Sequence, residues 1–412
     1  MVEIEEAEHS IGIKQDSAGT SSTTQCSIVD SIQQILEDSS STTQCYIYRV
    51  HEKLRRMNEF AYKPELVSIG PFHYGLGTIE KHKLCYVGAL LSSMGKINNK
   101  SLIDTWQDCV GRVEGFQDEA RKCYSEPIQL RNEKFVEILV TDGLFIIELF
   151  RRFAGLVAIP PNDPFLANHE NQIPMVILKC LMDVPSIKVC VGRYPLHVLT
   201  VRFFLPLLPQ NQSEDNIQAI VSSYDAKHLL DLLRKAFHNQ PQSVPEPKHG
   251  RDKKIASACI PCATELKQSG VKFVKGTGSS ILDIRFKDGI LEIPPLVIED
   301  NTDALLRNLI ALEQQVNGVD NYISSFAYMM DGLINSREDV RILRKAGIID
   351  NMLGADEDVA VLFNKICCGI NIGKSHYFEL YNELNTYYRT PWNQRIAMIK
   401  SFICCCSFSA CA

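Results

Sequence analysis

The feature that most constrains the fold is the strongly apolar segment from Lys134 to Phe153. Its large hydrophobic residues recur at helical spacing and cover well over half of the circumference of a helix. Because such a surface cannot face water along its length, the segment is predicted to form a buried central helix. The pair Asp142-Gly143 is expected to interrupt it. The sequence therefore favours a mainly α-helical fold built around this segment.

Further helices are predicted on both sides of this segment, where apolar residues recur at helical spacing. Ser336 and Asp339 form a capping pattern at one helix start, and Gly347 is a suitable stop. Pro174 is expected in the first turn of another helix, where proline sacrifices no hydrogen bond. The predicted ranges are Glu52 to Met57, His82 to Met94, Ser101 to Tyr124, Ile173 to Met182, Asp225 to Phe237, Ala256 to Gly270, Thr302 to Val316, Ile323 to Leu333, Ser336 to Ala346 and Asp356 to Ile366.

The clearest β signal lies between residues 271 and 293. Val271 to Val274 and Ile281 to Lys287 alternate apolar with polar residues, as strands do. Asp288-Gly289, followed by Ile290 to Ile293, favours a hairpin with a type I′ turn. The glycine-rich segment Gly276 to Ser280 leads into a strand, so it is interpreted as a hairpin connection and not as a phosphate-binding loop. The predicted fold class is mainly α, a large helical domain with a small antiparallel β-hairpin element.

Composition divides the chain into three parts. Residues 1–44 are rich in Ser, Thr, Gln and acidic residues, which predicts a disordered tail. Residues 45–400 are expected to form the folded domain, with an exposed linker near 239–254 that is rich in proline and charge. Residues 401–412 form an apolar, cysteine-rich tail that is too short to span a bilayer.

Charge and cysteine usage restrict the partners and the compartment. The chain has 49 acidic and 43 basic side chains and a net charge of -6, which argues against nucleic acid as a partner. The chain has 15 cysteines, and its N-terminus lacks the features of a secretory signal peptide. A reducing compartment is therefore expected. Cys180, Cys190 and Cys367 lie in apolar runs and are predicted to be core residues. The expected location is the cytoplasm or the cytoplasmic face of the plasma membrane.

Polar residues in apolar or looped surroundings are the candidates for a ligand site. Asp142 lies in the most apolar helix, so its carboxylate must be paired, protonated or exposed in a cleft. A catalytic acid and an ion pair to a neighbouring loop both meet this requirement. His73, in a loop shaped by proline and glycine, could serve as a general base. Glu170, Asn171 and Gln172 could bind a small polar ligand or could satisfy loop backbones.

No motif in the sequence specifies a cofactor. GxSxG, Walker and GxGxxG patterns are missing, and the pair Cys259 and Cys262 lacks the second pair that a zinc site needs. We therefore expect no cofactor, metal or small-molecule substrate, and assign no catalytic residue. Cys404, Cys405 and Cys406 could carry palmitoyl groups and attach the protein peripherally to a membrane. A frayed or wrongly assigned gene end is the alternative explanation of this cysteine cluster.

Several short motifs follow one another in order between residues 46 and 400. They are Ile47 to Val50, Ala61 to Pro64, Val67 to His73, Val140 to Glu148, Glu170 to Pro174, Glu265 to Lys267, Gly270 to Phe273, Ile293 to Leu296, Arg307 to Glu313 and Glu338 to Val340. Together they resemble the plant "domain of unknown function 247" family. His51 and His169 depart from the family pattern, and the chain ends where members usually continue into a hydrophobic anchor. The resemblance implies a plant protein without assigned biochemistry, in a family often membrane-associated and linked to self-incompatibility and signalling.

Two hypotheses about function follow. The first is a non-enzymatic interaction or signalling module whose helical surface binds another protein. The alternative is an enzyme or small-ligand binder that uses Asp142, His73 and Glu170 around one pocket. Convergence of these three side chains on one cavity would favour the alternative.

Overall fold

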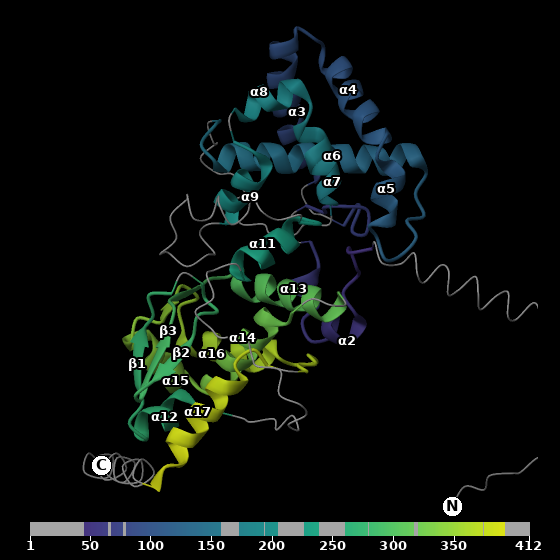
Figure 1. Cartoon of the computed structure of the whole chain (residues 1–412). Coiled ribbons are helices and arrows are strands. Elements are labelled where there is room, and N and C mark those ends of the chain that lie inside the picture. Colours follow the sequence, from purple (N-terminus) through teal and green to yellow (C-terminus); the bar gives the residue numbers. More distant parts are fainter. Residues whose placement is uncertain are drawn as a thin grey trace, which may run out of the picture. The chain divides into compact units, whose positions relative to one another are not determined.

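The computed structural model describes residues 45–64, 67–76, 80–157, 173–192, 194–204, 226–238, 260–278, 280–316, 320–373 and 375–391 (Figure 1). The chain divides into two units, Met1–Cys45 and Tyr46–Ala412, and the following description concerns the second. The predicted tail of residues 1–44, the linker near 239–254 and the C-terminal tail of residues 401–412 lie outside the described residues.

The first group of helices is built around α6. Phe135, Leu139, Leu144 and Ile147 of this helix are inaccessible to solvent, which confirms the predicted buried central helix. Other helices of the group pack directly on α6, and α8 packs on α3 and α7 (Figure 1). The bounds are α3 Glu80–Asn98, α4 Leu102–Glu114, α5 Gln117–Lys122, α6 Asn132–Phe153, α7 Met175–Met182, α8 Pro185–Val191 and α9 Leu196–Phe204.

Helix α6 runs through Asp142 and Gly143 without a break, so the predicted interruption is wrong. Gly143 instead lies where α7 approaches α6. A Cβ atom at Gly143 would lie 2.4 Å from Cδ1 of Leu181 on α7. Glycine at position 143 therefore allows α6 and α7 to pack closely, and it does not mark the end of a helix.

Adding a methyl group at Gly143 tests this contact. Gly143→Ala should lower the free energy of unfolding by about 1 kcal/mol, because overpacking against buried Leu181 outweighs the gain in helix propensity. Gly88→Ala on α3 is the matched control, since a Cβ there meets nothing within 4 Å. It should raise stability by up to about 1 kcal/mol. Urea unfolding of both variants measures the two signs, and stabilisation by Gly143→Ala would show that Leu181 moves aside freely.

The second group of helices contains most of the remaining described chain. Helices α13, α14 and α16 pack on one another, α11 contacts α9 and α13, and α15 contacts α12 and α16. One cluster of buried apolar side chains runs through both groups, from Ile47 to Leu384. The mainly α fold class is therefore confirmed. The bounds are α2 Glu52–Arg55, η2 Phe60–Tyr62, α11 Leu229–His238, α12 Ala263–Gln268, α13 Thr302–Gln315, α14 Tyr322–Leu333, α15 Arg337–Lys345, α16 Asp356–Ile366 and α17 Phe378–Arg389.

Three details of the helix predictions are different in the structure. The predicted helix from Ser101 to Tyr124 divides into α4 and α5 around Gly115. Pro174 is the N-cap of α7 and not a residue of its first turn. Helices α8, α9 and α17 were not predicted from the sequence. The capping pattern of Ser336 and Asp339 at the start of α15 is confirmed, because each side chain bonds to the other residue's backbone.

A three-stranded sheet has the order β1-β3-β2, with β1 Lys272–Lys275, β2 Arg285–Lys287 and β3 Ile290–Ile293. β2 and β3 are antiparallel, and the φ angles of 51° at Asp288 and 76° at Gly289 confirm the type I′ turn. β1 pairs with β3 in parallel, so the interpretation of residues 276–280 as a hairpin connection is wrong. The segment instead joins the two edges of the sheet, because β3 lies between them.

A second small sheet was not predicted. β4 (Leu296–Ile298) pairs in parallel with β5 (Ile349–Asn351), although the whole of α13, α14 and α15 lies between them in the sequence. The strands carry only three residues each, which is too short for a recognisable alternation.

Candidate functional site

Asp142 belongs to a buried ion network that joins α3 and α6 to the loop before α3. Its Oδ1 lies 2.7 Å from Nζ of Lys83, and its Oδ2 accepts the backbone N–H of Gly70 at 2.7 Å. Nζ of Lys83 also donates to the carbonyl of Ser68 at 2.8 Å and lies 2.7 Å from Oε2 of Glu80. Oε1 of Glu80 accepts the N–H and the hydroxyl of Ser68 at 2.7 and 2.6 Å. The three hydrogens of the Lys83 ammonium are therefore all bonded.

Burial and charge pairing act in opposite directions on the pKa values of Asp142 and Lys83. Burial raises the pKa of Asp142, while Lys83 and the N–H of Gly70 oppose the rise. Burial also disfavours the charged form of Lys83, but the carboxylates of Asp142 and Glu80 outweigh burial and raise the pKa of Lys83. A charged ammonium therefore faces Asp142 at neutral pH. Asp142 is thus ion-paired with Lys83 on α3 and hydrogen-bonded to the loop at Gly70, which is the structural role that the sequence allowed beside a catalytic acid.

Of the other residues predicted to form the ligand site, the structure describes His73. His73 is half-buried in the loop that contains Gly70, and it does not line the surface groove between α4 and α6. Burial, helped by the positive charges of Arg49 and Arg55, lowers the pKa of His73 to about 4, so its ring is neutral at pH 7. The predicted site residues Glu170, Asn171 and Gln172 lie outside the described residues, as do Cys404, Cys405 and Cys406.

The buried side chain of His228 stabilises the start of α11. Nδ1 of His228 accepts the N–H of Asp231 at 3.2 Å, so this nitrogen must carry no proton. Burial lowers the pKa of His228 to about 4, with Asp231 opposing the shift. Between pH 6.5, its ordinary pKa, and about 4, the unfolded chain therefore binds a proton that the folded chain does not.

His228 should make the fold sensitive to mild acid. Its contribution to stability is present above pH 6.5 and is lost as the pH falls towards 4, by about 2 kcal/mol near pH 5. His228→Asn keeps a side-chain acceptor but does not titrate. Urea unfolding at about pH 7 and about pH 5 should show a smaller loss for the variant than for the parent protein. Equal losses would mean that His228 is not the group that responds.

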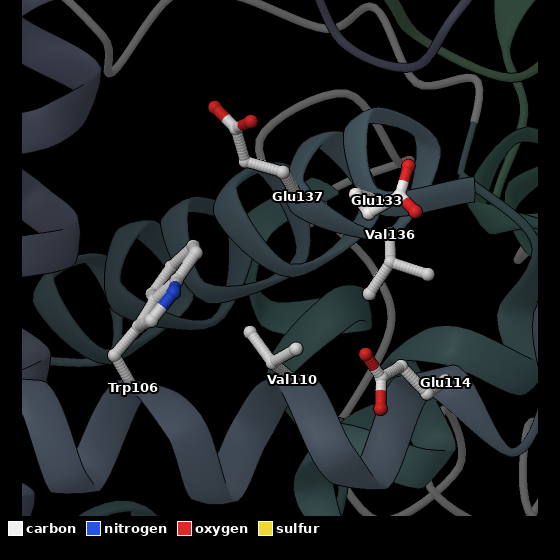
Figure 2. A pocket seen from close by; sticks show the side chains of 6 residues that line it. All are labelled: Trp106, Val110, Glu114, Glu133, Val136 and Glu137. Carbon is white, nitrogen blue, oxygen red and sulfur yellow. The ribbon is translucent and has the colours of Figure 1, made fainter. Parts of the chain in front are cut away.

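A surface groove of about 420 Å³ lies between α4 and α6. Trp106, Val110 and Glu114 line it from α4, and Glu133, Val136 and Glu137 line it from α6. Figure 2 shows Val110 and Val136 pointing toward one another from the two helices, with the indole of Trp106 beside them. The groove thus has an apolar floor and carboxylates on both walls.

The carboxylates of the groove differ in their pairing. Glu137 lies 2.8 Å from Nζ of Lys134, whose ammonium stands 4.8 Å from the ring centroid of Tyr74. Bonds to Glu137 and Tyr74 raise the pKa of Lys134 and keep it charged. Glu114 and Glu133 are exposed, and neither has an ion pair within the described part of the chain. The groove is therefore negatively charged.

An apolar strip extends the groove along α4. Ile103, Trp106 and Val110 follow one another at helical spacing, and Ile103 is 69% exposed. Sequence reasoning missed this strip, because an apolar face of a helix is usually a core face. The tryptophan among acidic residues was the available signal, since aromatic residues are enriched in protein interfaces.

Similar proteins are known from plants. The profile of the DUF247 family, described as "Plant protein of unknown function", matches residues 47–409. This chain belongs to the DUF247 family. The family resemblance of the sequence motifs is thereby confirmed.

The DUF247 chain has relatives in Arabidopsis thaliana. UPF0481 protein At3g47200 is 28% identical over 395 residues, which cover 87% of this chain and 80% of the relative. Putative UPF0481 protein At3g02645 is 21% identical over 450 residues, which cover 86% of this chain and 84% of the relative. No solved structure matches the chain.

Two further properties of this DUF247 protein concern the described residues alone. None of their helices has both the length and the hydropathy that a bilayer crossing requires. Within the same residues, no group of three or more histidine, cysteine, aspartate or glutamate side chains is placed to hold a metal ion.

Proposed function

We propose that this DUF247 protein is a non-enzymatic interaction module in signalling, and that it binds another protein through the groove between α4 and α6. The observation that carries the proposal is the strip of exposed Ile103 and half-buried Trp106 and Val110 beside unpaired carboxylates. Exposed apolar residues with a polar rim are typical of protein-binding surfaces. Tryptophan in particular often dominates the energy of such interfaces.

The buried polar groups support the same proposal. Asp142 is the strongest candidate for a catalytic acid, yet its oxygens are engaged by Lys83 and Gly70. Proton transfer to a substrate would have to break these contacts and leave a charge unpaired in the core. Their geometry suits a clamp that holds the loop of residues 67–76 on the helices. We therefore place the function of the protein at its surface, in the cytoplasm or at the cytoplasmic face of the plasma membrane.

Proximity labelling in plant tissue tests the proposal. Ile103→Glu combined with Trp106→Ala should remove specific partners from the labelled set, because the apolar contact is lost. Phe60→Glu is the matched control, since Phe60 is 80% exposed on η2 and lies outside the groove. Equal thermal unfolding of all variants must be established first. An unchanged set of partners in the groove variant would contradict the proposal, and the same labelling without residues 402–412 reports membrane residence.

A further inference from the structure

The charge of the groove is best explained by a partner of opposite charge. Glu133 lies in the first turn of α6, where a carboxylate stabilises a helix. Glu114 is the last residue of α4, where a carboxylate faces the negative end of the helix dipole. Within the described residues, no ion pair compensates Glu114. Glu114 therefore opposes the stability of its own helix, which indicates a role outside the fold.

The floor of the groove suits side chains that combine hydrocarbon with positive charge. Trp106 is half-buried and offers part of its indole, and Val110 and Val136 lie beside it (Figure 2). Lysine and arginine lay their apolar stems on such surfaces while the charged ends reach for carboxylates. A cation over an indole gains further electrostatic attraction. An aliphatic side chain of a partner would fit the remaining space between Val110 and Val136.

We propose that the groove binds a short basic segment of a partner protein, in which an aliphatic anchor is flanked by lysine or arginine. The anchor occupies the space beside Trp106 and Val136, and the cations face Glu114 and Glu133. A volume of about 420 Å³ admits a few side chains, so the occupant is a peptide segment and not a large apolar surface. This inference rests on the proposed function and adds the chemistry of the partner.

Charge complementarity also predicts how the segment binds. Three carboxylates line the groove and Lys134 partly neutralises only Glu137, so approaching cations are attracted and anions are repelled. Because Glu114 and Glu133 are exposed, added salt should weaken the attraction. An acidic segment of the same hydrophobicity should bind poorly.

Fluorescence of Trp106 measures the binding directly. The chain has two tryptophans, so Trp392→Phe leaves Trp106 as the single reporter in the full-length protein. The probe is a synthetic peptide with leucines at helical spacing and lysines between them. Comparison probes replace every lysine by glutamate or every leucine by serine, and spermine supplies cations without a peptide. We expect the lysine–leucine peptide to shift the emission of Trp106 and to bind more tightly than the other three.

Charge reversal then assigns the contact to the groove. Glu114→Lys with Glu133→Lys should weaken binding of the lysine–leucine peptide about tenfold, because two attractive pairs become repulsive. Glu379→Lys with Glu383→Lys on α17 makes the same change in net charge at exposed positions outside the groove. This control should change the affinity less than about threefold at physiological salt.

The possible outcomes separate this inference from the proposed function. Equal or tighter binding of the glutamate peptide, the serine peptide or spermine overturns the basic segment with an aliphatic anchor. The inference also fails if no peptide binds, or if both pairs of reversals weaken binding equally. If the groove variant nevertheless loses its partners in proximity labelling, the proposed function survives that failure. Unchanged labelling would remove both.

Discussion

Replacing Lys83 by methionine should lower the free energy of unfolding by about 3–5 kcal/mol. Asp142 is 2% exposed, and without Lys83 its carboxylate keeps only the N–H of Gly70 among the bonds described above. The carbonyl of Ser68 and one oxygen of Glu80 lose the same ammonium. An uncompensated carboxylate in the core is far more costly than the lost attraction between exposed charges. Urea unfolding at neutral pH measures the difference.

Two controls separate loss of the ion pair from loss of a lysine. Lys96→Met changes an exposed lysine on the same helix and should alter stability by less than about 0.5 kcal/mol. Lys83→Met combined with Asp142→Leu removes both charges and should recover most of the lost stability. If the double variant is no more stable than Lys83→Met alone, the penalty does not come from an unpaired Asp142.

Asp339→Ala should lower the free energy of unfolding by about 3 kcal/mol or more, because one carboxylate holds the start of α12 to the start of α15. Its Oδ1 accepts the N–H and the hydroxyl of Thr264, both at 2.7 Å. Its Oδ2 accepts the N–H of Asn335 at 3.2 Å and the N–H and hydroxyl of Ser336 at 2.9 and 2.8 Å. Alanine leaves these donors at the starts of α12 and α15 without their acceptor. Thermal and urea unfolding measure the loss.

Glu338→Ala is the matched control for Asp339. Glu338 is the neighbouring residue, its side chain is 54% exposed, and its ion pair with Arg341 is long at 3.6 Å. Removing it should change stability by less than about 0.5 kcal/mol. Similar losses for Asp339→Ala and Glu338→Ala would contradict the assignment of the bonds to Asp339.

Asp339 should also contribute to unfolding in strong acid. Burial opposes its ionisation and is the largest single effect, but the hydrogen bonds from Thr264 and Ser336 together outweigh it and lower the pKa of Asp339. The pKa of Asp339 in the folded protein thus lies below the unfolded value of 3.8. Its contribution to the stability of the protein is therefore present above that pH and is lost as the pH falls further. This range lies below the one in which His228 titrates.

Local features of the fold could be predicted from the sequence. Apolar residues around most of its circumference predicted that α6 is a buried helix, and Asp288-Gly289 predicted the hairpin turn. Both features depend only on residues that are close together in the sequence. The pairings of β1 with β3 and of β4 with β5 could not be predicted in this way. Parallel pairing joins residues far apart in the sequence, and it leaves no turn motif between the strands.

The site was less predictable than the fold. The sequence showed that Asp142 needed a partner, but Lys83 lies 59 residues away on another helix and nothing local identifies it. The groove depends on how α4 and α6 pack, so Glu114 and Glu133 could not be recognised as opposite walls. The spacing of Ile103, Trp106 and Val110 predicts an apolar face, but not whether that face is covered.

Hydrogen–deuterium exchange of the protein with a bound partner, compared with the protein alone, tests most directly whether the surface groove is the binding site. Slower exchange should be concentrated in α4 and in the first half of α6, while the backbone around Lys83 and Asp142 stays equally protected in both states. Protection confined to other helices, or opening of the Lys83–Asp142 network on binding, would contradict a rigid core with a protein-binding groove on its surface.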